Sequence, residues 1–273
     1  DYPMTSKPIR RIASKEDCDF ARKLNLELSG IECQNNLPIV NSKPLNLGLD
    51  LSSVCNINCI FCLAKNKRKQ KSDPDAFRDL AWLERLEFLL PFLNQAIFSS
   101  FEAILHPQFT DFVDKLSTYY TPFVLFSNGQ AITPELGEYL LANSMSRLSL
   151  SFHAATRETY EGIMRGASFD QAVENLMALK AIAKKLGRDD FILEMVFCAM
   201  KRNLDELVPY VLLAKKLGAR KVQVNYLQVP FEDQEYEWES VFFHQDLYDL
   251  KILEAKAIAQ ANGLEFAHRA LFR

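Results

Sequence analysis

From Leu47 onward, short apolar runs rich in β-forming residues alternate with longer stretches of helical period, and this alternation constrains the fold more than any other feature. Such alternation is typical of βα units around a parallel sheet. Six units can be drawn, and a chain of 273 residues suits one large α/β domain with a short extension. The sequence therefore predicts the α/β class, with a partial (β/α)6 barrel of the TIM type and a short N-terminal helical extension.

The predicted elements follow one another regularly along the chain. The six strands are expected over 47–51, 96–100, 123–127, 147–152, 191–198 and 221–227. A helix is expected after each, over about 76–93, 109–119, 134–143, 169–186, 204–217 and 247–261. Residues 1–45 are interpreted as an extension with one helix over about 14–28, capped by Ser14. Residues 46–273 are the expected core, which includes an acidic loop at about 230–240.

Composition and charge exclude several classes of protein. Apolar residues make up 48% and charged residues 25%, as in an average globular protein, which excludes disordered and collagen-like chains. The net charge of −3 offers no general attraction to nucleic acid or anionic lipid, so neither is expected as a main partner. No apolar run approaches the roughly 18 to 20 residues of a membrane span, and no leader precedes Asp1. We therefore expect a cytoplasmic protein.

Two runs of charge interrupt the alternating pattern. One is basic and comprises Lys65, Lys67, Arg68, Lys69 and Lys71. The other is acidic, interleaved with two aromatic residues, and comprises Glu232, Asp233, Glu235, Tyr236, Glu237, Trp238 and Glu239. A solvated loop is the simpler interpretation of both runs, and a partner-binding patch is the alternative. The alternative is slightly stronger for the acidic run, which follows a strand end, where barrel enzymes keep their substrate loops.

Three closely spaced cysteines are the strongest functional signal. Cys55, Cys59 and Cys62 have the spacing Cys-x3-Cys-x2-Cys directly after the first predicted strand. Thiolates at this spacing can hold an iron-sulfur cluster or a zinc ion. Structural sites normally close with four ligands, and the next candidate ligand is His106, so three thiols leave one metal position open. The other cysteines are Cys18, Cys33 and Cys198, and we interpret them as buried thiols. A disulfide between Cys18 and Cys33 is the alternative.

Polar residues repeat with period two along several predicted strands. Helices cover the outer face of a barrel, so these polar residues are expected to point into the lumen. The lumen set is Asp50, Ser149, Ser151, His153, Glu194, Cys198, Gln223 and Asn225. The alternate positions are apolar: Leu49, Leu51, Leu148, Leu150, Phe152, Leu193, Phe197, Val222 and Val224. Buried polar groups need hydrogen bonds to a ligand or to one another, and the sequence leaves both options open.

The three cysteines, with Phe61 before the last, resemble the Cys-x3-Cys-x-aromatic-Cys signature of the radical S-adenosylmethionine (SAM) superfamily. The resemblance covers roughly residues 47–227. It implies a [4Fe-4S] cluster whose open iron binds SAM and, when reduced, cleaves it to a 5'-deoxyadenosyl radical that abstracts hydrogen from substrate. It also implies a reductant such as flavodoxin or ferredoxin, and a substrate that is a peptide or a small molecule such as a sugar.

Further segments resemble the family in the same order. Glu102 aligns with the family's acid near the SAM amino group, although Phe101 stands where the family has glycine. The stretches 127–129, 149–151 and 163–166 resemble the family's Thr-Asn-Gly, its fourth strand and the segment whose arginine pairs with the SAM carboxylate. The resemblance therefore implies that Phe61 contacts adenine. The other implied SAM contacts are Ser100, Glu102, Asn128, Ser151 and Arg165.

Two residues of the lumen set are the candidates for substrate chemistry. Glu194 is expected beside the reacting 5'-carbon, because a carboxylate inside a barrel needs a partner. Cys198 is a candidate hydrogen-atom donor to a substrate radical, which would make the reaction an epimerisation, and a buried structural thiol is the simpler alternative.

Two other functions remain: a non-catalytic iron-sulfur or zinc module, and a barrel lyase or hydrolase with incidental thiols. No evident acid, base and nucleophile constellation supports the second.

Overall fold

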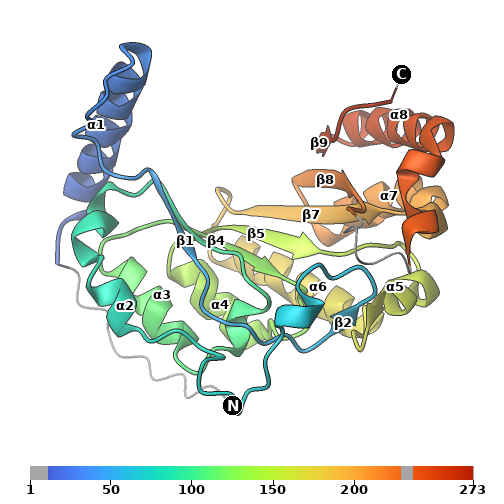
Figure 1. The fold of residues 1–273 in the computed structure, drawn as a ribbon, viewed down its shortest axis with the longest axis horizontal. Helices are drawn as coiled ribbons and strands as arrows, with labels where there is room; N and C mark the ends of the chain where they lie inside the picture. Colours follow the sequence, from blue (N-terminus) through green and yellow to red (C-terminus); the bar gives the residue numbers. More distant parts are fainter. Residues whose placement is uncertain (1–11, 229–235, 273) are drawn as a thin grey trace.

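A single parallel sheet organises the molecule. The computed structural model describes residues 12–228 and 236–272, and the seven strands of its main sheet lie in the order β1-β3-β4-β5-β7-β8-β9. The strands are β1 (Asn46–Leu49), β3 (Gln95–Phe98), β4 (Phe123–Ser127), β5 (Met145–Ser151), β7 (Ile192–Ala199), β8 (Lys221–Tyr226) and β9 (Glu265–His268). The sheet curves into the partial barrel that the sequence predicts, with helices along its outer side (Figure 1).

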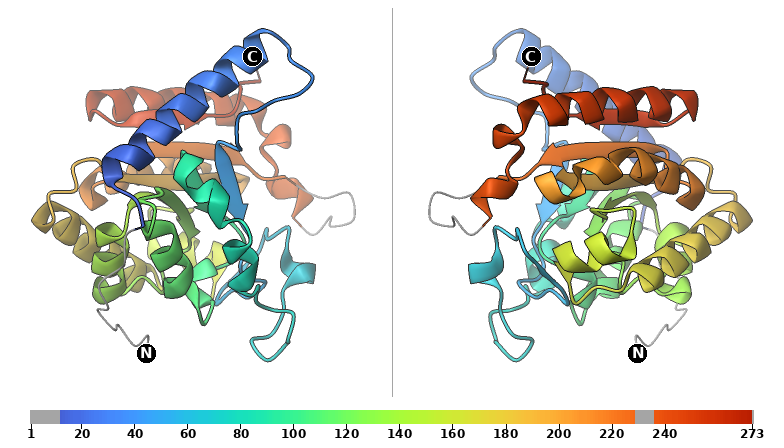
Figure 2. Two further views of the ribbon diagram at one scale, coloured as in Figure 1. Left: turned by 90° about the vertical axis from the view of Figure 1, so that its left-hand side faces the viewer. Right: turned by 90° about the vertical axis from the view of Figure 1, so that its right-hand side faces the viewer.

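The helices follow the strands in the expected alternation. They are α1 (Lys15–Gln34), α2 (Ala81–Glu84), α3 (Phe109–Ser117), α4 (Pro134–Ala142), α5 (Arg157–Ile163), α6 (Phe169–Lys185), α7 (Leu207–Leu217) and α8 (Gln245–Ala261). The two ends of the chain's described part lie at opposite edges of the sheet, α1 beside the β1 side and α8 beside β9 (Figures 1 and 2). The α/β class and the partial barrel are confirmed.

One predicted helix is wrong, and one strand of the main sheet was not predicted. The helix expected over 76–93 is only the single turn α2 followed by a 3-10 segment, Glu87–Phe92, because Pro91 has no N–H to donate and breaks the α-helical ladder. The strand β9 was not predicted. It has four residues, two of them charged or ionisable, and it reaches strand geometry by pairing in parallel with β8.

The predicted N-terminal helix exists and is longer than expected. Ser14 caps α1 by accepting a hydrogen bond from the backbone N–H of Asp17, as predicted. The helix packs on the barrel through Asn25, whose side-chain amide donates to the carbonyl oxygens of Lys43 and Phe92. The division of the chain into an extension over 1–45 and a core over 46–273 stays a prediction.

The period-two pattern separates the two faces of the sheet. All nine apolar positions of the alternate phase are buried in one continuous core. Four members of the lumen set line a cavity inside the barrel: Ser151, His153, Cys198 and Asn225. The assignment of the two strand faces is therefore confirmed at these positions.

The cysteines outside the motif are all free thiols. Cys18 is buried, as expected, whereas Cys33 is exposed, so the expectation of a buried thiol is wrong there because the residue lies on the outer side of α1. Neither takes part in the disulfide left open by the sequence. Within the described residues, no helix has the length and apolar character needed to span a membrane.

Candidate active site

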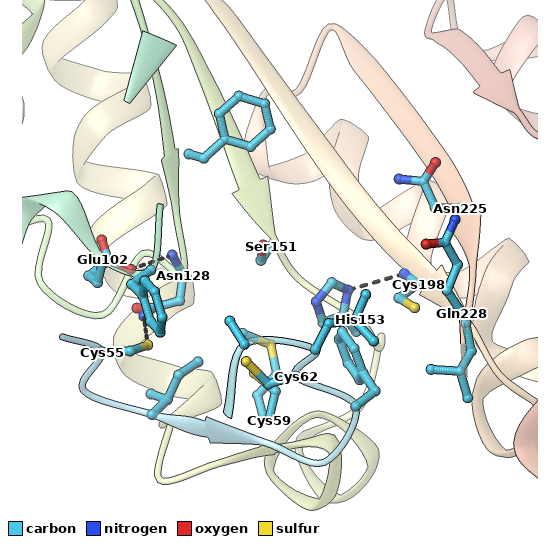
Figure 3. A pocket seen from close by; sticks show the side chains of 18 of the residues that line it. Cys55, Cys59, Cys62, Glu102, Asn128, Ser151, His153, Cys198, Asn225 and Gln228 are labelled. Atoms are coloured by element: carbon cyan, nitrogen blue, oxygen red, sulfur yellow. Dashed lines mark hydrogen bonds between the residues drawn. The ribbon is translucent and has the colours of Figure 1, made fainter. Parts of the chain in front are cut away.

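A cavity of about 500 Å³ opens at the carboxyl ends of the strands. Its walls come from the loops that leave β1, β3 and β4 and from the ends of β5, β7 and β8 (Figure 3). In parallel α/β folds the carboxyl ends of the strands meet at one edge, and ligands bind there. Segments far apart in sequence thus contribute to one site.

The cysteine loop forms one wall of this cavity. Cys55, Cys59 and Cys62 all line it as partly exposed free thiols (Figure 3). Cys59 belongs to the short strand β2 (Asn58–Cys59), which pairs antiparallel with β6 (Met164–Arg165), and the N–H of Cys62 donates to the carbonyl oxygen of Cys59 over 3.2 Å. The two-stranded ribbon therefore fixes the loop against the segment after α5. Burial raises the pKa of Cys55, and it raises that of Cys59 to about 12.

The donor set fits a cluster better than a single ion. In the part of the chain that the structure describes, no three His, Cys, Asp or Glu side chains converge tightly enough to hold one metal ion. A zinc ion would draw each sulfur to about 2.3 Å from one point, whereas a cuboidal cluster spreads its thiolates over separate irons. Three thiols along one wall match the second arrangement. The side-chain amide of Asn128 also lies 3.9 Å from the sulfur of Cys55, as a hydrogen-bond donor.

His106, the candidate fourth ligand, is engaged elsewhere. Its Nε2 lies 2.8 Å from the carbonyl oxygen of Arg78, and its Nδ1 accepts from the backbone N–H of Gln108 at 2.9 Å. The imidazole is buried and does not line the cavity. His106 is therefore not available to join the three thiols, and the assignment of Cys55, Cys59 and Cys62 as cluster ligands stays a prediction.

Glu102 is a fully buried carboxylic acid at the floor of the cavity. One carboxyl oxygen accepts from the Ser127 hydroxyl at 2.7 Å, and the other accepts from the backbone N–H of Asn128 at 2.9 Å. Burial raises the pKa of Glu102 to about 7, and these two hydrogen bonds oppose that effect only in part. Near neutral pH the group can thus exchange between its neutral and charged forms, and a bound cation would favour the charged one.

Phe101 has an unusual backbone at the position where the sequence departs from the family's glycine. Its φ angle is 41°, in the left-handed region that favours glycine, and its side chain lines the cavity. A bulky residue held in this region marks local strain, which tends to occur at ligand-binding sites. The chain thus keeps the backbone turn of a glycine while placing a ring in the cavity wall.

The remaining predicted SAM contacts divide into two groups. Phe61 and Ser151 line the cavity, as do Glu102 and Asn128. Ser100 does not: its hydroxyl is buried and finds no hydrogen-bond partner in the described structure, while its two neighbours face the cavity. Arg165 lies on the ribbon strand β6 and is exposed, outside the cavity lining. The structure thus brings four of the six contacts together.

His153 also lines the cavity. The sequence pattern placed it in the lumen set but did not predict that it contacts SAM or substrate. Its Nδ1 accepts from the backbone N–H of Cys198 at 3.1 Å, and the edge of its ring meets Phe61 with centroids 5.0 Å apart. Burial lowers its pKa to about 4, so the imidazole is neutral with its proton on Nε2. Asn203 donates to the carbonyl oxygens of both His153 and Cys198 at 2.9 Å, and no sequence signal indicated it.

Cys198 and Glu194 differ in their surroundings. Cys198 lines the cavity, and burial raises its pKa to about 12, so it is a neutral thiol. Glu194 is absent from the lining, and its carboxylate pairs with Lys221 at 3.0 Å and Arg147 at 3.9 Å. Four residues of strand separate the two, roughly 13 Å. The expected position of Glu194 beside the reacting carbon is therefore wrong, because its carboxylate is held by basic partners deeper in the barrel.

The two charged runs also have specific contacts. Glu239, part of the acidic run, is fully buried and forms an ion pair with Arg202, which corrects the interpretation as a solvated loop at this residue. Residues 229–235 of the same run lie outside the described residues. In the basic run, Lys69 pairs with Asp73 and Asp75.

Fold and site together define a class of protein: a partial barrel with three free cysteine thiols in one cavity at the carboxyl ends of its strands. The chain matches the family model of the radical SAM superfamily over residues 49–192, more than half of its length, and it belongs to that family. Enzymes of this family use a [4Fe-4S] cluster and SAM, the two cofactors that the sequence predicts.

Relatives are similar over part of their length. Mycofactocin maturase MftC of Mycobacterium tuberculosis is 26% identical over 176 residues, which cover 64% of this chain and 43% of the maturase. AdoMet-dependent heme synthase of Methanosarcina barkeri is 28% identical over 201 residues, which cover 69% of this chain and 52% of the synthase. The chain thus spans about half the length of the curated relatives it matches.

Solved structures share the fold. Streptococcus suis SuiB bound to S-adenosylmethionine has a TM-score of 0.69 at 15% identity, covering 90% of this chain and 54% of SuiB. SuiB bound to its precursor peptide SuiA has a TM-score of 0.64 at 14% identity, covering 90% of this chain and 52% of SuiB.

Proposed function

We propose that this chain forms the catalytic core of a radical SAM enzyme that modifies a peptide substrate. The observation that carries the proposal is the joint placement of Cys55, Cys59 and Cys62 in one cavity with Glu102 and Asn128. Cys55, Cys59 and Cys62 would hold the cluster, which when bound and reduced would supply the electron for cleavage of SAM to methionine and the 5'-deoxyadenosyl radical. The likeness of the fold to SuiB, solved with the precursor peptide SuiA bound, supports the substrate class.

The chain's own residues would bind and orient SAM. Phe61 offers an aromatic face, Glu102 offers a buried carboxylate for the SAM ammonium group, and the Ser151 hydroxyl offers a hydrogen bond. Ser100 and Arg165 remain proposed contacts for the amino and carboxylate ends. Arg165→Ala should weaken SAM binding to the reconstituted enzyme by tens of fold, since a charge-assisted contact is worth about 1.5 to 3 kcal/mol. Unchanged affinity would remove Arg165 from the site.

Cys198 is proposed as a hydrogen-atom donor. Its thiol is neutral and faces the cavity, as a donor of hydrogen must be. If it donates, the substrate radical takes the thiol hydrogen, and the sulfur radical left behind is returned to the thiol by an electron from the external reductant and a proton from solvent. Product formed in D2O then carries deuterium at the carbon from which hydrogen was abstracted, and Cys198→Ala abolishes this incorporation. A product without solvent deuterium would leave Cys198 as a structural thiol.

Metal analysis tests the cofactor assignment. Anaerobic reconstitution should give about four irons and four sulfides per chain, since the [4Fe-4S] cluster is the expected species. Replacing Cys59 by Ala should remove most of this loading, whereas replacing the exposed Cys33 by Ala should not. Stoichiometric zinc with negligible sulfide would favour the alternative function, a structural metal module.

A further inference from the structure

The cavity has a second side that the proposed SAM contacts do not use. The cysteine loop and the segments after β3 and β4 form one side. On the opposite side lie Asn225 at the end of β8, Gln228 just after it, and Arg269 directly after β9. Figure 3 shows Asn225 and Gln228 across the cavity from Cys55 and Glu102.

The charge of this second side is distinctive. Among the described lining residues, Arg269 is the one lysine or arginine. The one carboxyl group in that lining is Glu102, which is fully buried and held by Ser127 and Asn128 on the other side. Arg269 forms no ion pair with an acidic residue that the structure describes. Arg269 is exposed and lines the cavity, and such a guanidinium, with no counter-ion among the described residues, favours an anionic ligand.

The backbone that carries Arg269 is fixed on both sides. Its N–H donates to the carbonyl oxygen of Val224 at 3.3 Å, which continues the pairing of β9 with β8. Three residues later, the N–H of Phe272 donates to both carboxyl oxygens of Asp249 on α8, at 3.0 and 3.1 Å. The Phe272 ring also packs against Tyr248, with centroids 5.6 Å apart. Arg269 is therefore held at the cavity mouth by the sheet and by α8.

We propose that Arg269, assisted by Asn225 and Gln228, binds a carboxylate group of the substrate. The planar guanidinium donates two parallel hydrogen bonds that match a carboxylate. One cation and two neutral amides suit a single negative charge, and a phosphate dianion is usually met by more than one cation. The inference rests on the proposed function, in which the SAM carboxylate lies at the cysteine loop, so the anion at Arg269 comes from the second molecule.

Paired small probes test this proposal on the reconstituted, SAM-loaded enzyme. N-acetylphenylalanine carries a C-terminal carboxylate, N-acetylisoglutamine carries a side-chain carboxylate, and N-acetylphenylalaninamide carries none. Anaerobic calorimetric titration should show at least one carboxylate binding tenfold or more tightly than the amide. Arg269→Gln should remove this preference, and Arg269→Lys should retain part of it. Arg85→Gln, at an exposed arginine outside the cavity lining, is the matched control and should retain all of it.

Several outcomes would overturn the assignment. Equal affinity for carboxylates and amide, or a preference that survives Arg269→Gln, would exclude Arg269 as the recognition residue. Binding of inorganic phosphate alone would exclude a carboxylate. The same wild-type preparation is assayed separately for 5'-deoxyadenosine formation, so a failure of the proposed function is seen there and is distinct from a failure of carboxylate binding.

Discussion

At the scale of one residue, burial in the barrel raises the pKa of Glu102. It has no solvent exposure, and its two hydrogen bonds come from Ser127 and Asn128. The sequence placed this acid by resemblance to a family motif. Its raised pKa depends on burial by segments that are distant in sequence, which no local pattern encodes.

The pKa of Glu102 predicts a pH dependence of stability. The pKa is about 7 in the folded protein, against 4.5 as the ordinary value, so the folded state retains a proton that the unfolded state loses between these pH values. Stability is therefore lost as pH rises from about 4.5 to 7, by about 3 kcal/mol at 1.36 kcal/mol per pH unit. Urea unfolding of the cofactor-free protein measures this, and Glu102→Gln should lack that part of the slope. If the unfolding free energies of the wild type and Glu102→Gln change with pH in the same way, Glu102 does not have the raised pKa.

At Phe101 we expect the usual stability order of alanine and glycine variants to be reversed. Alanine normally stabilises more than glycine, because glycine is more flexible when unfolded. At φ 41° the left-handed backbone costs a residue with a Cβ about 1 to 2 kcal/mol, so Phe101→Gly should be more stable than Phe101→Ala by about 1 kcal/mol. Thermal unfolding of both variants tests this. The exposed Phe88, whose φ is not positive, should show the opposite order.

At the scale of elements, Asn203 joins the ends of two strands. Its amide donates to the carbonyl oxygens of His153 and Cys198, and its side-chain oxygen accepts from the N–H of Met200 at 2.8 Å. The asparagine is fully buried. It therefore holds the ends of β5 and β7 at the separation that the cavity requires.

This junction predicts a large effect of a small substitution. Asn203→Ala leaves three buried backbone groups without the partner that Asn203 provides, and each costs about 1 to 3 kcal/mol, so a loss of at least about 3 kcal/mol of unfolding free energy is expected. Asn35→Ala is the matched control: that amide also bonds a carbonyl, of Ile31, but is exposed, and its loss should cost under about 1 kcal/mol. Similar losses for both variants would mean that Asn203 does not hold the junction.

Some of the strands could be predicted from the sequence and others could not. The strands β4, β5 and β7 were predictable because each combines β-forming residues with a clear burial pattern. The strand β9 was not, because its four residues become a strand by pairing with β8. Arg269 could not be placed for the same reason: its position at the cavity mouth depends on β9 and on the contact of Phe272 with Asp249. Glu194 had the correct strand face, but its depth in the barrel depended on its ion pairs.

At the scale of the whole molecule, the sheet order places the proposed cofactor side and the proposed substrate side of the cavity opposite each other. Segments after β1, β3 and β4 provide the thiols, Glu102 and Asn128, and the opposite edge provides Asn225 and Arg269. The family model covers residues 49–192, which include the first side but not the second. This distribution is the expected one for an enzyme that shares its cofactor chemistry with a large family and differs in its substrate.

Formation of 5'-deoxyadenosine tests whether this chain cleaves SAM with a cluster held by the three cysteines. The anaerobically reconstituted protein is mixed with SAM and a low-potential reductant, and 5'-deoxyadenosine is counted per cluster. We expect that the wild-type protein forms it and that Cys59→Ala, with its proposed cluster ligand removed, does not. A protein fully loaded with iron and sulfide that leaves SAM intact, or equal formation by the Cys59→Ala variant, would contradict the account.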